Sequence, residues 1–281
     1  RLQLIYSLGT WSEDWAGSPL GQFANEVESD IYLSTALLSS VHKGNFASVV
    51  REVKSKKLLQ RFLTFATRLG REQASIVFKQ IVTPENGRFA DWQLRAMASY
   101  LEAGSANLDL TQAAKMFEHA RAQVDSERTP EARLLLAIPL LGHEPKERVN
   151  DLDRLGDLLS PVCSVTLQNA AIRALGRIPS KKVPSILLRR WRSLSPSIRT
   201  KVLSVLLERR EGVIAVLEAL EKKKIRPLEI DVLRRQFLLR HRDAKVRERA
   251  KRSLASLVPE SRQKVLREYQ AVLKMRGDVE T

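Results

Sequence analysis

The chain has 281 residues, of which 43% are hydrophobic and 28% charged, a balance that supports a packed core and excludes an intrinsically disordered chain. No apolar run approaches the roughly 18 residues that a membrane-spanning helix needs, and the single cysteine, Cys163, excludes an internal disulfide or a thiolate metal cluster. Aromatic residues are few and strand-like alternation is rare, so the composition favours helix nearly throughout.

The formal net charge of +16 is concentrated in the last third of the chain. Residues 1–180 hold 21 basic and 20 acidic side chains, whereas residues 181–281 hold 27 basic and 12 acidic ones, so the net charges are +1 and +15. An excess of this size predicts an anionic partner, which is nucleic acid, an acidic protein surface or lipid headgroups.

Glycines recur along the chain at gaps of 26 to 38 residues, usually after an apolar helical run. They are Gly9, Gly44, Gly70, Gly104, Gly142, Gly176 and Gly212. Their position suits a left-handed residue just past a helix end, and the interval leaves room for two helices. We therefore predict an array of helical hairpins as the repeating unit.

Hydrophobic periodicity and capping signals place seventeen helices. Their expected ranges are 1–10, 17–28, 30–43, 46–56, 57–69, 71–82, 90–103, 111–126, 130–141, 146–159, 162–176, 181–194, 196–211, 213–224, 227–241, 243–257 and 261–276. Ser195 and Asp243 are expected N-caps. Thr129 and Ser160 are expected N-caps as well, because each precedes a proline at a first helical position.

Two segments interrupt the helical pattern. Residues 83–88 carry turn residues without periodicity and predict the strongest loop, while Pro139 lies inside a helical run and predicts a kink. Neither has the composition of a linker, so we expect one continuous array over residues 1–281, with a weak break near 83–89 and a basic third at 181–281.

Short motifs on three predicted helices resemble HEAT repeats, in which an apolar helix opens with Asp or Pro and carries Val-Arg. Residues 243–247 (Asp-Ala-Lys-Val-Arg), followed by Ala250 and Leu254, match this pattern best. Residues 196–199 and 161–165 are weaker matches. The resemblance implies an all-α fold, a right-handed α–α superhelix of the HEAT or armadillo type with about seven or eight helical hairpins, and implies little about function.

The two ends carry a second resemblance. Residues 265–278, with Tyr269 and Gly277, are similar to the junction before the c-type cytochrome domain of large secreted bacterial proteins, and residues 1–9 and 30–40 are similar to the entry of their helical array. Those proteins join a sugar-dehydrogenase-like propeller, a HEAT-like array and a terminal Cys-x-x-Cys-His haem domain. The resemblance implies a segment of a longer, extracytoplasmic protein, with haem c bound downstream of Thr281 and no cofactor in this segment.

Basic side chains recur at one hairpin's spacing in the last third, and we predict that they line one face for an anionic partner. The candidates are Arg189, Arg190, Trp191, Arg192, Lys222, Lys223, Lys224, Arg234, Arg235, Arg240, Arg242, Lys245, Arg247, Arg249, Lys251 and Arg252. One interpretation is a docking face for a neighbouring domain of the same polypeptide or for an acidic protein. The alternative is a HEAT-like DNA-binding protein or DNA glycosylase, in which Trp191 stacks on a base. Some HEAT-like glycosylases use an aromatic residue and a carboxylate near the lesion, but no motif links Trp191 to the Asp91-Trp92 pair.

No catalytic or metal site emerges from the sequence. The four histidines, His42, His119, His143 and His241, are widely separated and match no zinc-ligand spacing, and phosphate-binding and nucleophile motifs are absent. A cluster at residues 151, 153 and 157 is interpreted as a solvated acidic helix face. We therefore predict a non-catalytic scaffold or protein-interaction segment with no membrane span. The resemblance implies that the segment belongs to a larger haem-containing protein associated with electron transfer or a dehydrogenase.

Overall fold

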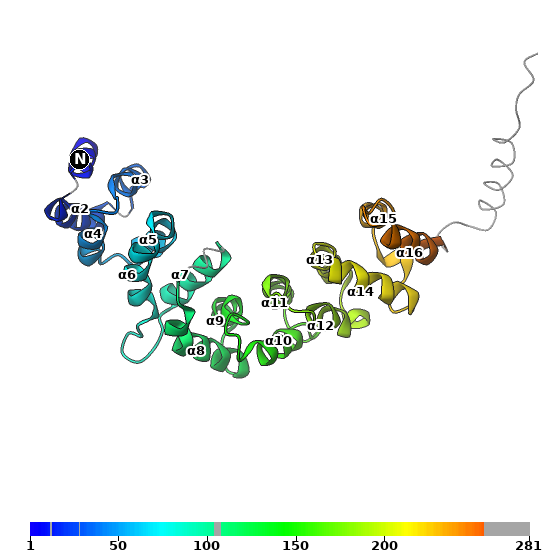
Figure 1. Ribbon diagram of the computed structural model, residues 1–281. Coiled ribbons are helices and arrows are strands. Elements are labelled where there is room, and N and C mark those ends of the chain that lie inside the picture. Colours follow the sequence, from blue (N-terminus) through cyan, green and yellow to red (C-terminus); the bar gives the residue numbers. More distant parts are fainter. Residues whose placement is uncertain (12, 28, 104–107, 256–281) are drawn as a thin grey trace, which may run out of the picture. The chain divides into compact units, whose positions relative to one another are not determined.

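The computed structural model describes residues 1–11, 13–27, 29–103 and 108–255, and within them the chain is all-helical (Figure 1). The α-helices are α1 (Leu2–Gly9), α2 (Asp14–Glu26), α3 (Ile31–Ser40), α4 (Phe46–Glu52), α5 (Lys56–Leu69), α6 (Arg71–Val82), α7 (Asp91–Glu102), α8 (Ala114–Asp125), α9 (Glu131–Ala137), α10 (Arg148–Asp157), α11 (Val165–Arg177), α12 (Val183–Arg189), α13 (Pro196–Leu207), α14 (Arg210–Glu221), α15 (Val232–Leu239) and α16 (Ala244–Leu254). Short 3₁₀ helices are η1 (Leu110–Ala113), η2 (Ile138–Leu140), η3 (Trp191–Ser193) and η4 (Pro227–Glu229). The all-α prediction is thus confirmed for these residues, whereas the expected helix 261–276 lies outside them.

The chain divides into two compact units, Arg1–Asp157 and Leu158–Thr281. The division does not fall near residues 83–89, where we expected a weak break. That segment is a tight loop inside the first unit, closed by an antiparallel bridge between Glu85 and Arg88, with Asn86 and Gly87 at positive φ between them. The predicted loop is confirmed, but helices on either side of it pack together and hold it within one unit.

In the first unit, helices in each of two rows pack against the next helix but one, and some consecutive helices also pack together, most extensively α5 with α6 (Figure 1). One row contains the contacts α1 with α3, α5 with α7 and α7 with α9, and the other the contacts α2 with α4 and α4 with α6. The consecutive pairs with the most extensive contact are α1 with α2, α5 with α6 and α8 with α9. Helical hairpins are thus present in this unit, and a regular repeat over its whole length stays a prediction.

Glycines bring α2 and α4 unusually close. A Cβ atom placed on Gly17 would lie 2.6 Å from the carbonyl oxygen of Asn45, and one placed on Gly21 would lie 2.4 Å from that of Val49. Both distances are below any normal Cβ contact, so the two helices cross at a separation that only glycine permits.

The predicted role of the recurring glycines is only partly correct. Gly142 has a φ of 84° and occupies the left-handed region after a helical turn, as expected. Gly9, Gly176 and Gly212 instead lie inside α1, α11 and α14, where a Cβ atom would collide with a neighbouring element. Close packing, and not helix termination, is what requires glycine at those three positions.

The second unit holds three hairpins, α11–α12, α13–α14 and α15–α16, again in two rows (Figure 1). The first helices α11 and α13 pack together, as do the second helices α12 with α14 and α14 with α16. The three HEAT-like motifs lie on α11, α13 and α16, so they do not all occupy equivalent positions: α16 is the second helix of its hairpin.

These three motif helices share one pattern of burial, counted from the N-cap residue. Ser164, Ser195 and Asp243 cap α11, α13 and α16 by accepting a backbone N–H bond of the first turn. The third, seventh and eleventh residues after each cap are buried apolar residues: Leu167, Ala171 and Leu175; Ile198, Val202 and Leu206; Val246, Ala250 and Leu254. This stripe is the apolar face that packs each helix onto its neighbours.

The fourth residue after each cap is a donor that ties its helix to the preceding connection. Gln168 donates to the carbonyl of Ser160 at 2.8 Å, Arg199 to that of Arg192 at 2.8 Å and Arg247 to that of His241 at 2.8 Å. Each donor satisfies a carbonyl that no helix hydrogen bond reaches. The arginine of the HEAT-like motif therefore has a structural role in this chain.

Three expected helix boundaries are wrong in detail. Ser160 does not cap α11, because the chain continues as a turn and Ser164 accepts the N–H of Leu167 instead. Thr129 does not cap α9 either, since Pro130 itself is the N-cap residue. Pro139 does not kink one continuous helix up to residue 141: α9 ends at Ala137, and the chain continues as the 3₁₀ helix η2, which contains the proline.

Candidate functional site

The second helices of the second unit run in the same direction, so their C-terminal ends lie along one edge. Glu221, at the end of α14, forms a bidentate ion pair with Arg249 of α16, and the connection after α12 contacts the connection after α14 through Trp191 and Glu229. The N-terminal ends of α14 and α16 also meet, at Arg210 and Asp243. We call the edge formed by the C-terminal ends of α12, α14 and α16 the C-terminal edge, and the edge formed by their N-terminal ends the N-terminal edge.

The C-terminal edge gathers basic residues at equivalent positions of three successive hairpins. They are Arg189, Arg190 and Arg192 after α12, Lys222, Lys223, Lys224 and Arg226 after α14, and Lys251 and Arg252 at the end of α16. Between the last two groups is an open cleft of about 780 Å³, lined by Lys223, Arg226, Arg252 and the carboxylate of Glu221 among others. Eight of the sixteen predicted residues therefore lie along this edge, and together with Arg226 we call them the basic strip.

Trp191 does not belong to that strip, and its predicted role in stacking on a base is wrong. Its side chain is fully buried, its indole N–H donates to Oε2 of Glu229 at 3.3 Å, and the Arg199 guanidinium lies 5.6 Å from its ring centroid. Trp191 is a core residue that anchors the connection after α12, and no base can reach its ring.

Glu229 links the elements around Trp191. Burial by itself raises the pKa of this carboxyl, but the backbone N–H of Arg226, the Trp191 N–H and the nearby Arg199 charge outweigh it and hold the pKa below its usual value. The carboxylate accepts the Arg226 N–H at 2.7 Å and pairs with the Arg199 guanidinium. This cluster fixes the connections that present the basic strip.

Three predicted members of the face have structural partners, and a fourth, Arg235, is half-buried, with a buried Nε atom that has no hydrogen-bond partner among the described residues. Arg234 pairs with Asp231 and donates to Ser204 of α13. Arg247 donates to two backbone carbonyls, and Arg249 pairs with Glu221, which raises the pKa of the guanidinium. Charge reversal at Arg234 and Arg235, which would leave folding intact if both were surface residues, is therefore expected to be destabilising.

Other predicted residues lie on the opposite edge. Arg240, Arg242 and Lys245 are exposed beside the N-terminal end of α16, close to Arg210 of α14. Arg210, which follows Arg209, and Arg226 on the C-terminal edge, which follows the run of three lysines, were not among the predicted residues. Their hairpin-equivalent spacing from Arg242 and Arg190 was the available signal.

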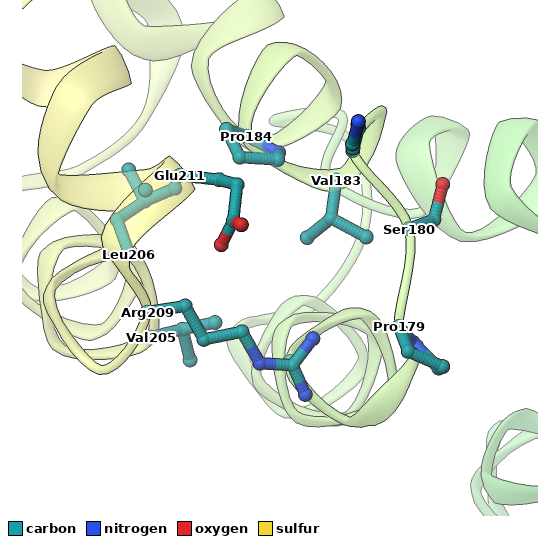
Figure 2. A pocket seen from close by; sticks show the side chains of 11 residues that line it. Pro179, Ser180, Val183, Pro184, Val205, Leu206, Arg209 and Glu211 are labelled. Atoms are coloured by element: carbon teal, nitrogen blue, oxygen red, sulfur yellow. The ribbon is translucent and has the colours of Figure 1, made fainter.

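A smaller cleft lies on the N-terminal edge between the first two hairpins of this unit (Figure 2). It encloses about 330 Å³ and is walled by apolar residues, including the buried Val183 and Pro184. Glu211 points into it, and Arg209 extends across it to donate to the carbonyl of Ile178 at 2.9 Å. The arginine ties the start of α14 to the connection after α11.

The predicted acidic helix face of α10 is wrong at its first residue. Asp151 is 1% exposed, accepts the N–H of Gly142 at 2.9 Å and lies 3.8 Å from Arg121 and 3.4 Å from Arg154. Burial raises the pKa of this carboxyl, against the opposing effect of the Gly142 hydrogen bond and the two arginines. Asp151 is thus a buried acceptor that fixes the Gly142 turn.

The histidines stay far apart in the fold and each has a local contact. His42 contacts the carbonyl of Trp11, His119 and His143 lie beside Phe89 and Phe117, and His241 accepts the N–H of Asp243. Burial, with the charge of Arg133, lowers the pKa of His119. Across the described ranges, no three His, Cys, Asp or Glu side chains gather in a group suited to a metal ion.

No protein-family model matches the chain, and no curated protein sequence matches it either. Among the helices described, none is long and apolar enough to cross a membrane.

Proposed function

We propose that this chain is a non-catalytic, HEAT-like interaction module that binds an acidic protein surface along the C-terminal edge of its second unit. The observation that carries the proposal is the gathering of cations from three successive hairpins onto that one edge. A repeated positive strip on a rigid helical array attracts a partner of opposite charge over an extended surface.

Local structure accounts for only part of this strip. Cations at the C-terminal end of a helix stabilise the helix through its dipole, by about 0.3–1 kcal/mol each, so some basic residues are expected there in any protein. Lys222, Lys223, Lys224 and Arg226 continue the charge beyond the end of α14, and Lys223 adopts a positive φ of 54°. A partner with complementary charge explains this run better than helix capping alone.

The proposed context is a segment of a larger, extracytoplasmic haem-containing protein, with a c-type cytochrome domain downstream of Thr281 as the acidic partner. The support is the similarity of residues 1–9, 30–40 and 265–278 to the array borders of such proteins. A tethered domain would bind at high effective concentration, so a modest electrostatic contact would suffice. Coding sequence that continues beyond Thr281 into a Cys-x-x-Cys-His motif would support this context, and a stop codon there would refute it.

The binding test uses the whole chain and two probes, fluorescein-labelled poly-L-glutamate and a labelled DNA duplex, measured by anisotropy over a range of salt. The triple variant Lys222→Glu, Lys223→Glu, Arg252→Glu is expected to weaken polyglutamate binding by about tenfold or more, since each exposed contact contributes about 0.2–1 kcal/mol. The affinity of the unmodified chain should fall steeply with salt.

A matched control reverses three exposed charges of the first unit, Lys115, Arg128 and Lys146, and so changes the net charge equally. If both triples weaken polyglutamate binding to the same degree, net charge and not the C-terminal edge is responsible, and the proposal fails. Tight duplex binding that persists above roughly 200 mM salt would instead support the DNA-binding alternative. That alternative has lost the stacking residue assigned to it, because Trp191 is buried.

A further inference from the structure

A groove on the N-terminal edge, away from the strip just described, has an apolar floor and a basic rim. It lies between the α13–α14 corner and α15, and its volume is about 850 Å³. Leu207, Val213, Leu233 and Phe237 supply its apolar surface, and Gln236 lies between the last two on α15. We call it the α15 groove.

Two large apolar side chains of this groove are exposed to solvent. Leu233 is 78% exposed and Phe237 is 45% exposed, and they lie one turn apart on the same side of α15. Leaving them in water costs hydrophobic free energy that burial against a partner would recover. Exposed apolar surface with a polar rim is typical of a protein interaction site.

The hairpin repeat itself does not require apolar residues at these two positions. Counted from the N-cap residues Ser164, Ser195 and Asp231, the equivalents of Leu233 and Phe237 are Thr166 and Ala170 in α11 and Ser197 and Lys201 in α13. Thr166, Ser197 and Lys201 are exposed polar residues, as the outer side of a surface helix normally is. The two large side chains are therefore specific to α15.

The equivalent cleft one hairpin earlier is smaller. That cleft, shown in Figure 2, has a volume of about 330 Å³ and is lined by Val183 and Pro184 at the start of α12, both buried. The α15 groove is more than twice as large, and its lining includes the exposed Leu233 and Phe237.

The charges at the rim select the kind of partner. Arg210, Arg240 and Arg242 are exposed there, and the Arg210 side chain is 74% exposed. The acidic residues at the rim are Glu208 and Asp243; the Asp243 carboxylate already accepts the N–H of Lys245 at 2.9 Å and lies 3.5 Å from Arg210. A cation at the N-terminal end of α14 opposes the helix dipole, so the local stabilisation of Arg210 is limited to its long, exposed ion pair with Asp243.

We propose that the α15 groove binds a linear acidic segment of a partner protein, with a bulky apolar side chain seated against Leu233 and Phe237 and flanking carboxylates paired with Arg210, Arg240 and Arg242. The chain's own residues 256–281 are a poor occupant on charge, because they hold five basic and four acidic side chains. The inference concerns a different edge from the proposed function and stands without it.

The experiment measures binding of three labelled peptides to the full-length chain by fluorescence anisotropy. The first peptide has glutamates on both sides of a central Leu-Ala-Ala-Phe segment, the second replaces Leu and Phe with Ala, and the third replaces the glutamates with Gln. The first should bind at least about tenfold more tightly than either control, since one buried Leu or Phe contributes about 1.5–3 kcal/mol.

The double variant Leu233→Ser, Phe237→Ser should reduce binding of the first peptide to the level of the second, while circular dichroism shows an unchanged fold. Leu228→Ser is the matched control, because Leu228 is 82% exposed and does not line the groove. The triple reversal on the C-terminal edge should leave the preference for the first peptide over the second intact, so the two proposals fail separately.

Three results would overturn the inference. The first is equal binding of the first two peptides, and the second is retention of binding in the Leu233 and Phe237 double variant. The third is tighter peptide binding after Leu266→Asp and Tyr269→Asp, which would mean that the chain's own C-terminal segment occupies the groove.

Discussion

Replacing Trp191 with alanine tests whether this residue is a core anchor or part of a binding surface. The indole is fully buried, and a tryptophan side chain buries about 150–250 Å² of surface. At about 25 cal/mol per Å², this burial corresponds to about 4–6 kcal/mol, from which the part retained by alanine is subtracted. The cavity and the lost N–H bond to Glu229 add to the cost, so we expect Trp191→Ala to lower the free energy of unfolding by about 3–5 kcal/mol.

The assay is urea denaturation followed by circular dichroism at 222 nm, with the change assigned to the transition of the second unit. Trp15→Ala is the matched control, because Trp15 is 52% exposed and its removal should change stability by no more than about 0.5 kcal/mol. A Trp191→Ala variant as stable as the unmodified chain, but with weaker binding to single-stranded DNA, would refute the assignment of Trp191 to the core.

Substitutions at three further positions test other contacts. Gly21→Ala should destabilise the first unit by about 1–3 kcal/mol in urea denaturation, because its Cβ would lie 2.4 Å from the Val49 carbonyl oxygen. The pKa of Glu229 is lowered in the folded state, so the ionised carboxylate stabilises the fold above pH 4.5, and this stabilisation is lost as the pH falls through the pKa of the folded state. Glu229→Gln should make the free energy of unfolding less dependent on pH in this range and lower it by about 1–3 kcal/mol at pH 7. Asp151→Ala should be less stable than Asp151→Asn by about 1–3 kcal/mol, since only asparagine keeps an acceptor for the Gly142 N–H, and equal thermal stability of the two would contradict this role.

Helix positions followed from local signals, because apolar periodicity and capping residues act within a few residues of the chain. Ser195 and Asp243 cap helices as predicted, and the Asn86-Gly87 turn lies in the predicted loop. The glycine roles were harder to predict. A glycine that permits close packing, such as Gly176, and one that ends a helix, such as Gly142, follow similar apolar runs, and only the packing of other helices separates them.

The candidate site was less predictable, since the spacing of charges along the chain does not reveal which of them meet a carboxylate or a carbonyl. Arg247 and Arg249 are two residues apart in α16. Arg247 donates to the carbonyl of His241 in the preceding connection, whereas Arg249 forms an ion pair with Glu221 of α14. Trp191 lies within a run of arginines, yet it is buried, and its N–H donates to Glu229, which is 38 residues away in the sequence. Long-range pairing of this kind has no local sequence signal.

The donors that follow each N-cap restrict how the chain tolerates insertions. Arg199 and Arg247 each span a connection of fixed length, so an inserted residue there would move the carbonyl acceptors out of reach. The tip at Asn86 and Gly87 is constrained differently: a Cβ atom at Gly87 would meet no atom within 4 Å, but both residues adopt a positive φ in a turn closed by the bridge between Glu85 and Arg88. A label at this tip therefore has room to project from the protein, provided that the Asn-Gly pair of the turn is kept.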